Sequence, residues 1–113
     1  MKRTIRSPRD IDALFRKGRR GSHRTLMVMS SPTPTGRGPQ GRVAFIAGRK
    51  LGGAVVRNRY KRVMREAVRR HGGPWTGLDV ALVARPGLAD AEPAGIDRAL
   101  ETCLIGAGVI SGD

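Results

Sequence analysis

The sequence is poor in cysteine, in long hydrophobic runs and in acidic residues, and each shortage excludes a class of function. Cys103 is the only cysteine among the 113 residues, which excludes an internal disulfide and a thiolate metal cage. Its apolar neighbours favour a small core residue. No hydrophobic run approaches the ~20 residues of a membrane span, and no charged-then-apolar secretion signal opens the chain. We therefore expect a cytoplasmic protein with no membrane partner.

The carboxylates are too few and too scattered for an autonomous nuclease site. Metal-dependent phosphodiester cleavage needs several acidic side chains around Mg²⁺, whereas Asp10, Asp12 and Glu66 are far apart in the sequence and lie among cations. His23 and His71 have no second metal-type ligand at a useful spacing. The residues therefore predict a binding module with no catalytic residue and no metal held by the protein.

Positive charge is abundant and unevenly distributed. The 22 Lys and Arg residues against nine Asp and Glu give a net charge of +13. Residues 1–78 carry 20 of these cations and three acidic residues, whereas residues 79–113 carry two cations and six acidic residues. Such a charge repels itself in a compact fold unless a polyanion is bound. Nucleic acid is the favoured partner, and we expect it to dock on the first two-thirds of the chain.

Residues 51–70 combine a cationic stripe and an apolar stripe at helical spacing. The apolar stripe comprises Val56, Tyr60, Val63, Met64, Ala67 and Val68, and the cationic stripe comprises Asn58, Lys61, Arg62, Arg65 and Arg69. Arginine binds phosphates bidentately, and the amide of an asparagine among arginines can read a base edge or a ribose hydroxyl. The pattern favours an RNA-binding face, with an ordinary solvated basic helix as the alternative.

Helical and strand patterns alternate along the rest of the chain. Ser7 and Pro8 predict a helix start, and Gly18 ends that helix. The other expected elements are a helix from Pro93 to about Gly106 and strands over 25–29, 42–47 and 79–85. Residues 1–6 are expected to be a mobile basic arm, and the three prolines and three glycines of 30–41 predict a flexible loop. A strand, the central helix and a further strand imply a parallel pair.

One motif is specific enough to indicate a family. Residues 48–67 read Gly-Arg-Lys-Leu-Gly-Gly-Ala-Val-Val-Arg-Asn-Arg-Tyr-Lys-Arg-Val-Met-Arg-Glu-Ala. This run closely resembles the signature of the bacterial ribonuclease P protein subunit, Arg-Asn-Arg followed by Lys-Arg and a further Arg. The resemblance implies a first short strand around 20–24, which the pattern alone does not indicate. It also implies a left-handed crossover, which the sequence cannot decide.

The fold class follows from the pattern and the resemblance together. We expect residues 1–113 to form a single α+β domain, an α/β two-layer structure in the order αβββαβα. Three helices pack on a small, mostly antiparallel sheet of about four strands, which includes one parallel βαβ crossover.

The resemblance also implies a function. The family's protein pairs with a large catalytic RNA, and the RNA with its Mg²⁺ cleaves the 5′ leader from precursor tRNA, leaving 5′-phosphomonoester ends. The implied protein is a subunit of this endoribonuclease that is inactive alone, holds no Mg²⁺ itself and has no obligate protein partner. The residues implied to bind the RNA subunit are Arg49, Lys50, Arg57, Asn58, Arg59, Lys61, Arg62, Arg65 and Arg69.

The resemblance implies a cleft for the leader between the sheet and the first helix, lined by Ile11, Phe15, Arg24, Met27 and Met29. Ile11 and Met29 stand where the family often has aromatic residues. An aromatic platform contributes about 1 to 3 kcal/mol per stacked base. We therefore expect a leader held more by charge and shape than by stacking.

Two other classes of protein could also account for this sequence. A small basic ribosomal protein, or another binder of structured RNA, would use the same helix face without any part in catalysis. A binder of anionic membranes is disfavoured, because the central helix has a narrow, core-like apolar stripe and no interfacial aromatic residue beyond Tyr60.

Overall fold

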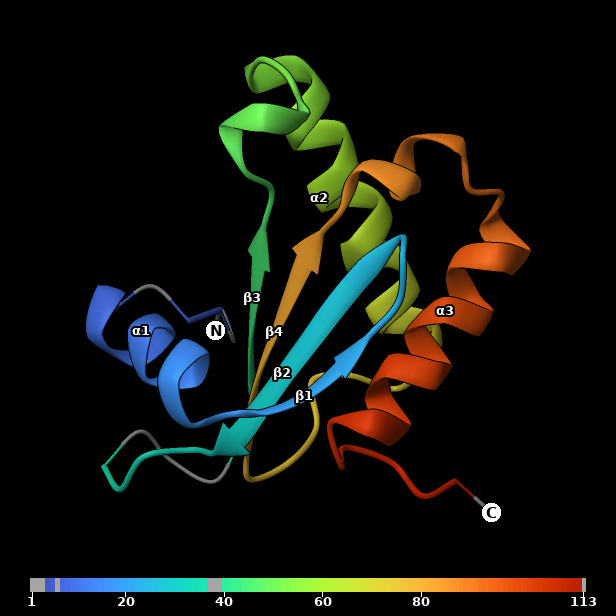
Figure 1. Cartoon of the computed structure of the whole chain (residues 1–113). Helices are drawn as coiled ribbons and strands as arrows, with labels where there is room; N and C mark the ends of the chain where they lie inside the picture. The colour runs from blue at the N-terminus through green and yellow to red at the C-terminus, as the bar shows by residue number, and fades with distance from the viewer. Residues whose placement is uncertain (1–3, 6, 37–39, 113) are drawn as a thin grey trace.

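The computed structural model describes residues 4–5, 7–36 and 40–112, and in these residues three α-helices cover a four-stranded sheet (Figure 1). The order αβββαβα confirms the predicted fold class. Two short 3₁₀ helices, η1 (Arg49–Leu51) and η2 (Pro86–Asp90), precede the second and third α-helices. The helices are α1 (Pro8–Lys17), α2 (Ala54–Arg70) and α3 (Pro93–Gly106), and the strands are β1 (Arg19–Ser22), β2 (Leu26–Pro32), β3 (Arg42–Ile46) and β4 (Leu78–Ala84).

The sheet has the strand order β1-β2-β4-β3. Strand β2 is antiparallel to β1 and β4, whereas β3 is parallel to β4. In Figure 1 both β3 and β4 run upward, β4 lies to the right of β3, and α2 passes behind them. The connection from β3 through α2 to β4 is therefore left-handed, the uncommon sense for a βαβ unit.

Hydrophobic side chains fill both faces of the sheet. On one face Met64 of α2 and Leu100 of α3 belong to the larger core cluster, together with Val80 and Leu82 of β4. On the other face Leu14 of α1 packs in a smaller cluster. The central strand β4 is buried from both sides, which explains its continuous apolar run. The partners of Leu14 in the smaller cluster are Ile5, Met29, Ala44 and Ala81.

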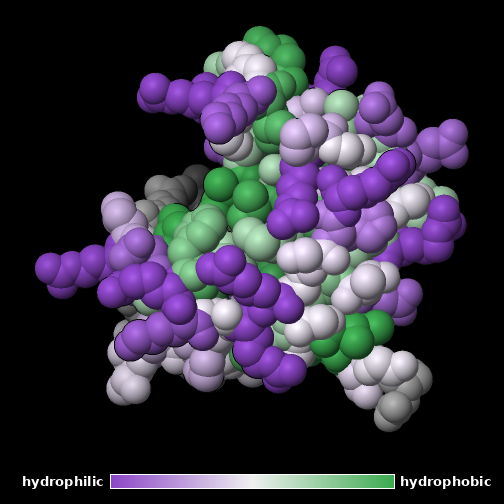
Figure 2. All heavy atoms as spheres, in the orientation of Figure 1, coloured by the Kyte–Doolittle hydropathy of each residue, from purple (hydrophilic) through white to green (hydrophobic). Residues whose placement is uncertain are grey.

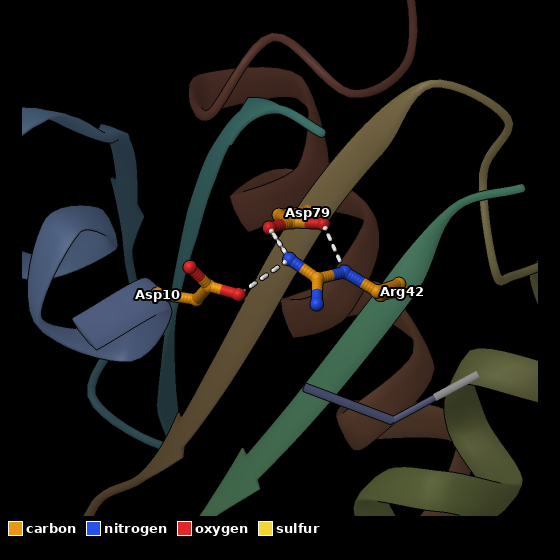
Figure 3. A network of polar contacts seen from close by, with 3 residues as sticks. All are labelled: Asp10, Arg42 and Asp79. Atoms are coloured by element: carbon orange, nitrogen blue, oxygen red, sulfur yellow. Dashed lines mark hydrogen bonds and ion pairs between the residues drawn. The ribbon is translucent and has the colours of Figure 1, made fainter. Parts of the chain in front are cut away.

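A largely buried ion-pair network fastens α1 to the sheet (Figure 3). The Arg42 guanidinium donates to both carboxylate oxygens of Asp79, at 2.9 Å and 2.5 Å, and to Oδ2 of Asp10 at 3.0 Å. The side chains of Arg42 and Asp79 are only 14% and 2% exposed. The hydrogen bond to Asp79 is the main cause that raises the pKa of Arg42. The network therefore joins α1, β3 and β4 at one end of the sheet.

The first residues of the chain depart from the prediction. Thr4 forms a parallel bridge with Val43, and the Ile5 N–H donates to the Val43 carbonyl at 2.9 Å. Ile5 is buried in the smaller cluster. The free edge of β3 offers unpaired backbone groups, so the prediction of a mobile arm over 1–6 is wrong for these two residues. Residues 1–3 and 6 lie outside the described part of the chain.

The flexible loop predicted over 30–41 begins too early. Ser30, Ser31 and Pro32 continue β2 and pair with β4. The buried Ser30 hydroxyl donates to the Ala107 carbonyl at 2.6 Å. The proline is tolerated because β1 pairs with β2 only as far as Ser30, so Pro32 lies at a free edge on that side. Residues 37–39, in the same predicted loop, lie outside the residues that the structure describes.

Helix α3 covers β1 and buries the single cysteine. A Cβ at Gly21 would lie 2.1 Å from the Cys103 carbonyl oxygen, so only glycine permits this approach of strand and helix. The strand ends at Ser22, earlier than the resemblance implied, because His23 and Thr25 form a turn in which their side chains interact at 3.0 Å. Cys103 is fully buried, as predicted, and burial raises the pKa of its thiol to about 11.

Candidate nucleic-acid interface

The apolar stripe of α2 holds the helix against the sheet. Met64, Ala67 and Val68 are buried, and Tyr60 and Val63 pack against the same core. Val56 is the exception, with 39% of its surface exposed. The prediction that it is buried is wrong because the first turn of α2 extends beyond the ends of β3 and β4 (Figure 1). The helix is thus anchored by its last three turns and leaves its beginning free.

The opposite side of α2 and the preceding η1 form the cationic face. Most of its cations are exposed, and only Arg57 and Lys61 are half-buried. Within the described chain, none of these cations forms an ion pair with a carboxylate. Figure 2 shows hydrophilic side chains around the end of the molecule where η1 and α2 begin. The cationic face comprises Arg49, Lys50, Arg57, Asn58, Arg59, Lys61, Arg62, Arg65 and Arg69.

Arg70 lies on the same helix but outside the cationic face, and it forms an ion pair that stabilises the fold. Its guanidinium donates to Asp97 of α3 at 2.8 Å and so joins the two helices. Arg65 instead lies over the Phe45 ring, with Cζ 5.3 Å from the ring centroid. The Arg57 Nε is buried and has no hydrogen-bond partner among the described residues. The cationic face therefore retains donors for an anionic ligand.

The face of the sheet beside α1 is covered only in part. Met27, Val83 and Ile46 lie side by side on β2, β4 and β3, and Ile11 and Phe15 of α1 adjoin them. All five side chains are half-buried. We call these five residues the open-face patch, which contributes to the hydrophobic surface next to α1 in Figure 2.

The structure separates two residues of the predicted leader cleft from the other three. Met29 is completely buried beneath α1, so the prediction that it lines an open cleft is wrong. Arg24 is exposed, but it borders a different hollow with Asp90, Glu92 and Arg98 near the start of α3. Ile11, Phe15 and Met27 do lie together, in the open-face patch.

Two arginines beside the open-face patch were missed by the sequence reasoning. Arg20 donates through Nη2 to the Phe15 carbonyl at the end of α1. Arg85 lies at the other end, with Nη2 3.7 Å from the Met27 sulfur and Nη1 donating to the His23 carbonyl. Strand alternation offered a signal, since Arg85 follows Val83 by two residues. We missed it because Arg85 belongs to the acidic last third of the sequence.

The described residues do not gather metal ligands. They contain no group of three or more His, Cys, Asp or Glu side chains that could hold a metal ion. Asp10 and Asp79, which share the Arg42 guanidinium, are already engaged by that cation. None of the described helices is long and apolar enough to cross a membrane.

Helix α2 packs on the core and presents arginines that have no carboxylate partner among the described residues, and the other face of the sheet carries an apolar patch flanked by two further arginines. Together they have the chemistry that RNA recognition requires. The fold and the site together define a small α+β RNA-binding protein.

Comparisons with known proteins identify its family. The family model described as Ribonuclease P matches residues 1–108. The chain is 39% identical over 96 residues to the ribonuclease P protein component of Nocardioides sp., covering 83% of this chain and 81% of that protein. It is 36% identical over 110 residues to the corresponding protein of Roseiflexus castenholzii, covering 96% and 88%. The chain belongs to the ribonuclease P protein family.

Solved structures agree with this assignment. The structure of the Staphylococcus aureus RNase P protein matches with a TM-score of 0.81 and 27% identity, covering 96% of this chain and 98% of that one. As a member of the family, the protein is a subunit of ribonuclease P, an endoribonuclease, and acts with an RNA subunit in the processing of tRNA 5′ ends. This result sets aside the alternative of a ribosomal protein.

Proposed function

We propose that the cationic face binds the catalytic RNA subunit and that the open-face patch holds the 5′ leader of precursor tRNA. This proposal is based on the absence of carboxylate partners, among the described residues, for the cations of this face. Unlike Arg70, the α2 cations of this face have no such partner in the described chain, and the core fixes their helix in place. Such a face repels itself until phosphates bind.

The side chains of the cationic face divide into two kinds of contact. Arg59, Arg62 and Arg69 are exposed and can each bind a phosphate through two parallel N–H donors. Asn58 is exposed among them and supplies a neutral amide for a base edge or a ribose hydroxyl. Arg49 and Lys50 extend the cationic surface beyond the start of the helix. Phosphate contacts fix the register of the RNA, and the amide adds selectivity.

The chemistry of cleavage is assigned to the RNA and its Mg²⁺. Asp10 of α1 and Asp79 of β4 both accept hydrogen bonds from Arg42. The chain's own contribution is to neutralise phosphates, so that the RNA and the leader approach each other at a lower Mg²⁺ concentration. No further protein is needed for this role, and a cytoplasmic location fits the processing of tRNA.

The leader is proposed to lie on the open-face patch as a single strand. Phe15 offers one aromatic surface for a base, while Ile11, Met27, Ile46 and Val83 offer apolar contact. Arg20 and Arg85, at the two ends, are placed to bind leader phosphates. With a single aromatic side chain, the patch holds the leader mainly by charge and shape.

Replacing Phe15 with alanine is expected to weaken binding of precursor tRNA to the reconstituted holoenzyme by about tenfold, the effect of losing one base stack. Binding of mature tRNA, which has no leader, should not change. The measurement is the dissociation constant of each RNA at one salt concentration. Met29→Leu is the matched control, because Met29 is buried beneath α1 and cannot contact RNA. Equal losses for both RNAs, or none for either, would refute the leader site.

A further inference from the structure

A hollow between α2 and the edge of the sheet borders the cationic face, and phosphate binding alone does not explain its apolar lining. Its volume is about 300 Å³, at the lower end of the range for ligand sites. The buried or half-buried side chains of Val43, Phe45, Val68 and Pro74 give it an apolar floor. The exposed Arg65 and Arg69, with Thr4 and Gly73, complete the lining. Phosphates bind to donors and gain nothing from an apolar floor. The lining instead suits a ligand with a flat apolar surface and a negative charge beside it.

We infer that this hollow accepts one unstacked nucleobase of the catalytic RNA, with the phosphate next to that base bound by Arg69. The inference rests on the proposed function, because it assigns a base-binding site within the same RNA-binding face. RNA-binding proteins recognise unpaired bases by stacking them on aromatic side chains and on arginine guanidinium planes. Here the two kinds of surface are already combined, because the Arg65 guanidinium lies over the Phe45 ring.

Arg65 differs from the neighbouring arginines because its guanidinium lies over an aromatic ring, that of Phe45. The Phe45 ring centroid lies 5.3 Å from the Arg65 Cζ, and both side chains line the hollow. The Arg65 side chain makes no hydrogen bond or ion pair with the described residues. Its outer surface can therefore stack on a base, and its N–H groups can donate to the edge of that base or to a phosphate. Phe45 acts as a positioning residue for Arg65.

The walls of the hollow are fixed by the fold. Val43 and Val68 are buried members of the larger core cluster. Gly73 borders the hollow where a Cβ would lie 2.5 Å from the Val68 side chain and 2.9 Å from the Trp75 ring. A larger residue at position 73 would therefore disturb this wall. The site is thus pre-formed, which lowers the entropy cost of ordering it around a base.

The test measures how the full-length protein binds a bacterial ribonuclease P RNA. The wild type is compared with the variants Arg65→Lys and Phe45→Leu. Arg65→Lys keeps the charge and removes the flat guanidinium. Both variants are expected to weaken RNA binding by about tenfold, equivalent to one lost stack, with an unchanged dependence of log affinity on log salt. Base-specific chemical probing should show one unpaired base that the wild type protects and both variants expose. The rest of the footprint should remain.

The control is Trp75→Leu, which removes a half-buried aromatic ring that packs on the core without lining the hollow. This variant should retain protection of the base. The inference is overturned if Arg65→Lys binds as tightly as the wild type, or if Trp75→Leu loses the protection equally. Arg65 is exposed, so Arg65→Lys should fold even if Phe45→Leu does not. A wild-type protein that does not bind the RNA at all would instead overturn the proposed function.

Discussion

Replacing Arg42 with methionine is expected to lower the free energy of unfolding by about 3 to 5 kcal/mol, the range for removing one member of a buried ion pair. The substitution leaves the Asp79 carboxylate, which is 2% exposed, without the cation that donates to both of its oxygens. It also releases Asp10 from the guanidinium and so loosens α1 on the sheet. Because the pKa of Arg42 is raised, the arginine stays charged at any working pH, and alkaline solution should not reproduce the effect.

Urea denaturation of the free protein measures this loss. Arg16→Met is the matched control, because the Arg16 and Asp12 side chains are about two-thirds exposed in their i,i+4 pair, at 67% and 65%. Exposed pairs contribute only about 0 to 1 kcal/mol. The double variant Arg42→Met, Asp79→Leu should recover part of the stability, since an apolar pair can replace a buried ion pair. An Arg42→Met variant as stable as the control would contradict this account of how α1 is held.

The triple variant Arg62→Ala, Arg65→Ala, Arg69→Ala is expected to lose most of the salt-dependent affinity for the catalytic RNA. Each phosphate contact contributes roughly 0.7 to 0.9 to the slope of log affinity against log salt, so three lost contacts should flatten the slope by about two to three units. The melting temperature should change little, because all three side chains are exposed and lie outside the apolar stripe.

RNA affinity at four salt concentrations tests this expectation. Asn58→Ala is a neutral comparison on the same face, and it should weaken binding with almost no change of slope, because an amide has no charge to neutralise. Arg98→Ala removes an exposed cation of α3, away from the cationic face, and should leave the slope unchanged. Equal slopes for the wild type and the triple variant would show that the cationic face is only solvated surface.

Periodicity predicted the parts of the fold in which one local pattern decides the structure. The two stripes of α2 are one example, and the strands predicted over 42–47 and 79–85 are others, because they match β3 and β4 to within one residue at each end. Periodicity does not show where a neighbouring element ends. It could not indicate that α2 extends past the sheet and exposes Val56.

Contacts between distant parts of the chain account for the other differences between the predicted and the observed structure. Ser30 belongs to β2 because its hydroxyl reaches Ala107, and Ile5 is ordered because β3 has a free edge. The resemblance indicated the surface for the leader, yet α1 covers Met29 and leaves Met27 accessible. The pairing of β2 with β4 brings Arg85 to Met27, a contact across 58 positions of the sequence. Alternation can place Arg85 on the same face as Val83, but only the register of β2 with β4 brings it to Met27.

The central claim is that the protein assists an RNA catalyst through the cationic face of α2. The most direct measurement is the rate of 5′ leader removal from precursor tRNA at limiting Mg²⁺, with the RNA subunit alone, the protein alone, and the RNA with either the wild-type protein or the triple variant. We predict rapid cleavage only when the RNA and the wild-type protein are combined. Cleavage by the protein alone, or equal stimulation by the triple variant, would contradict the account.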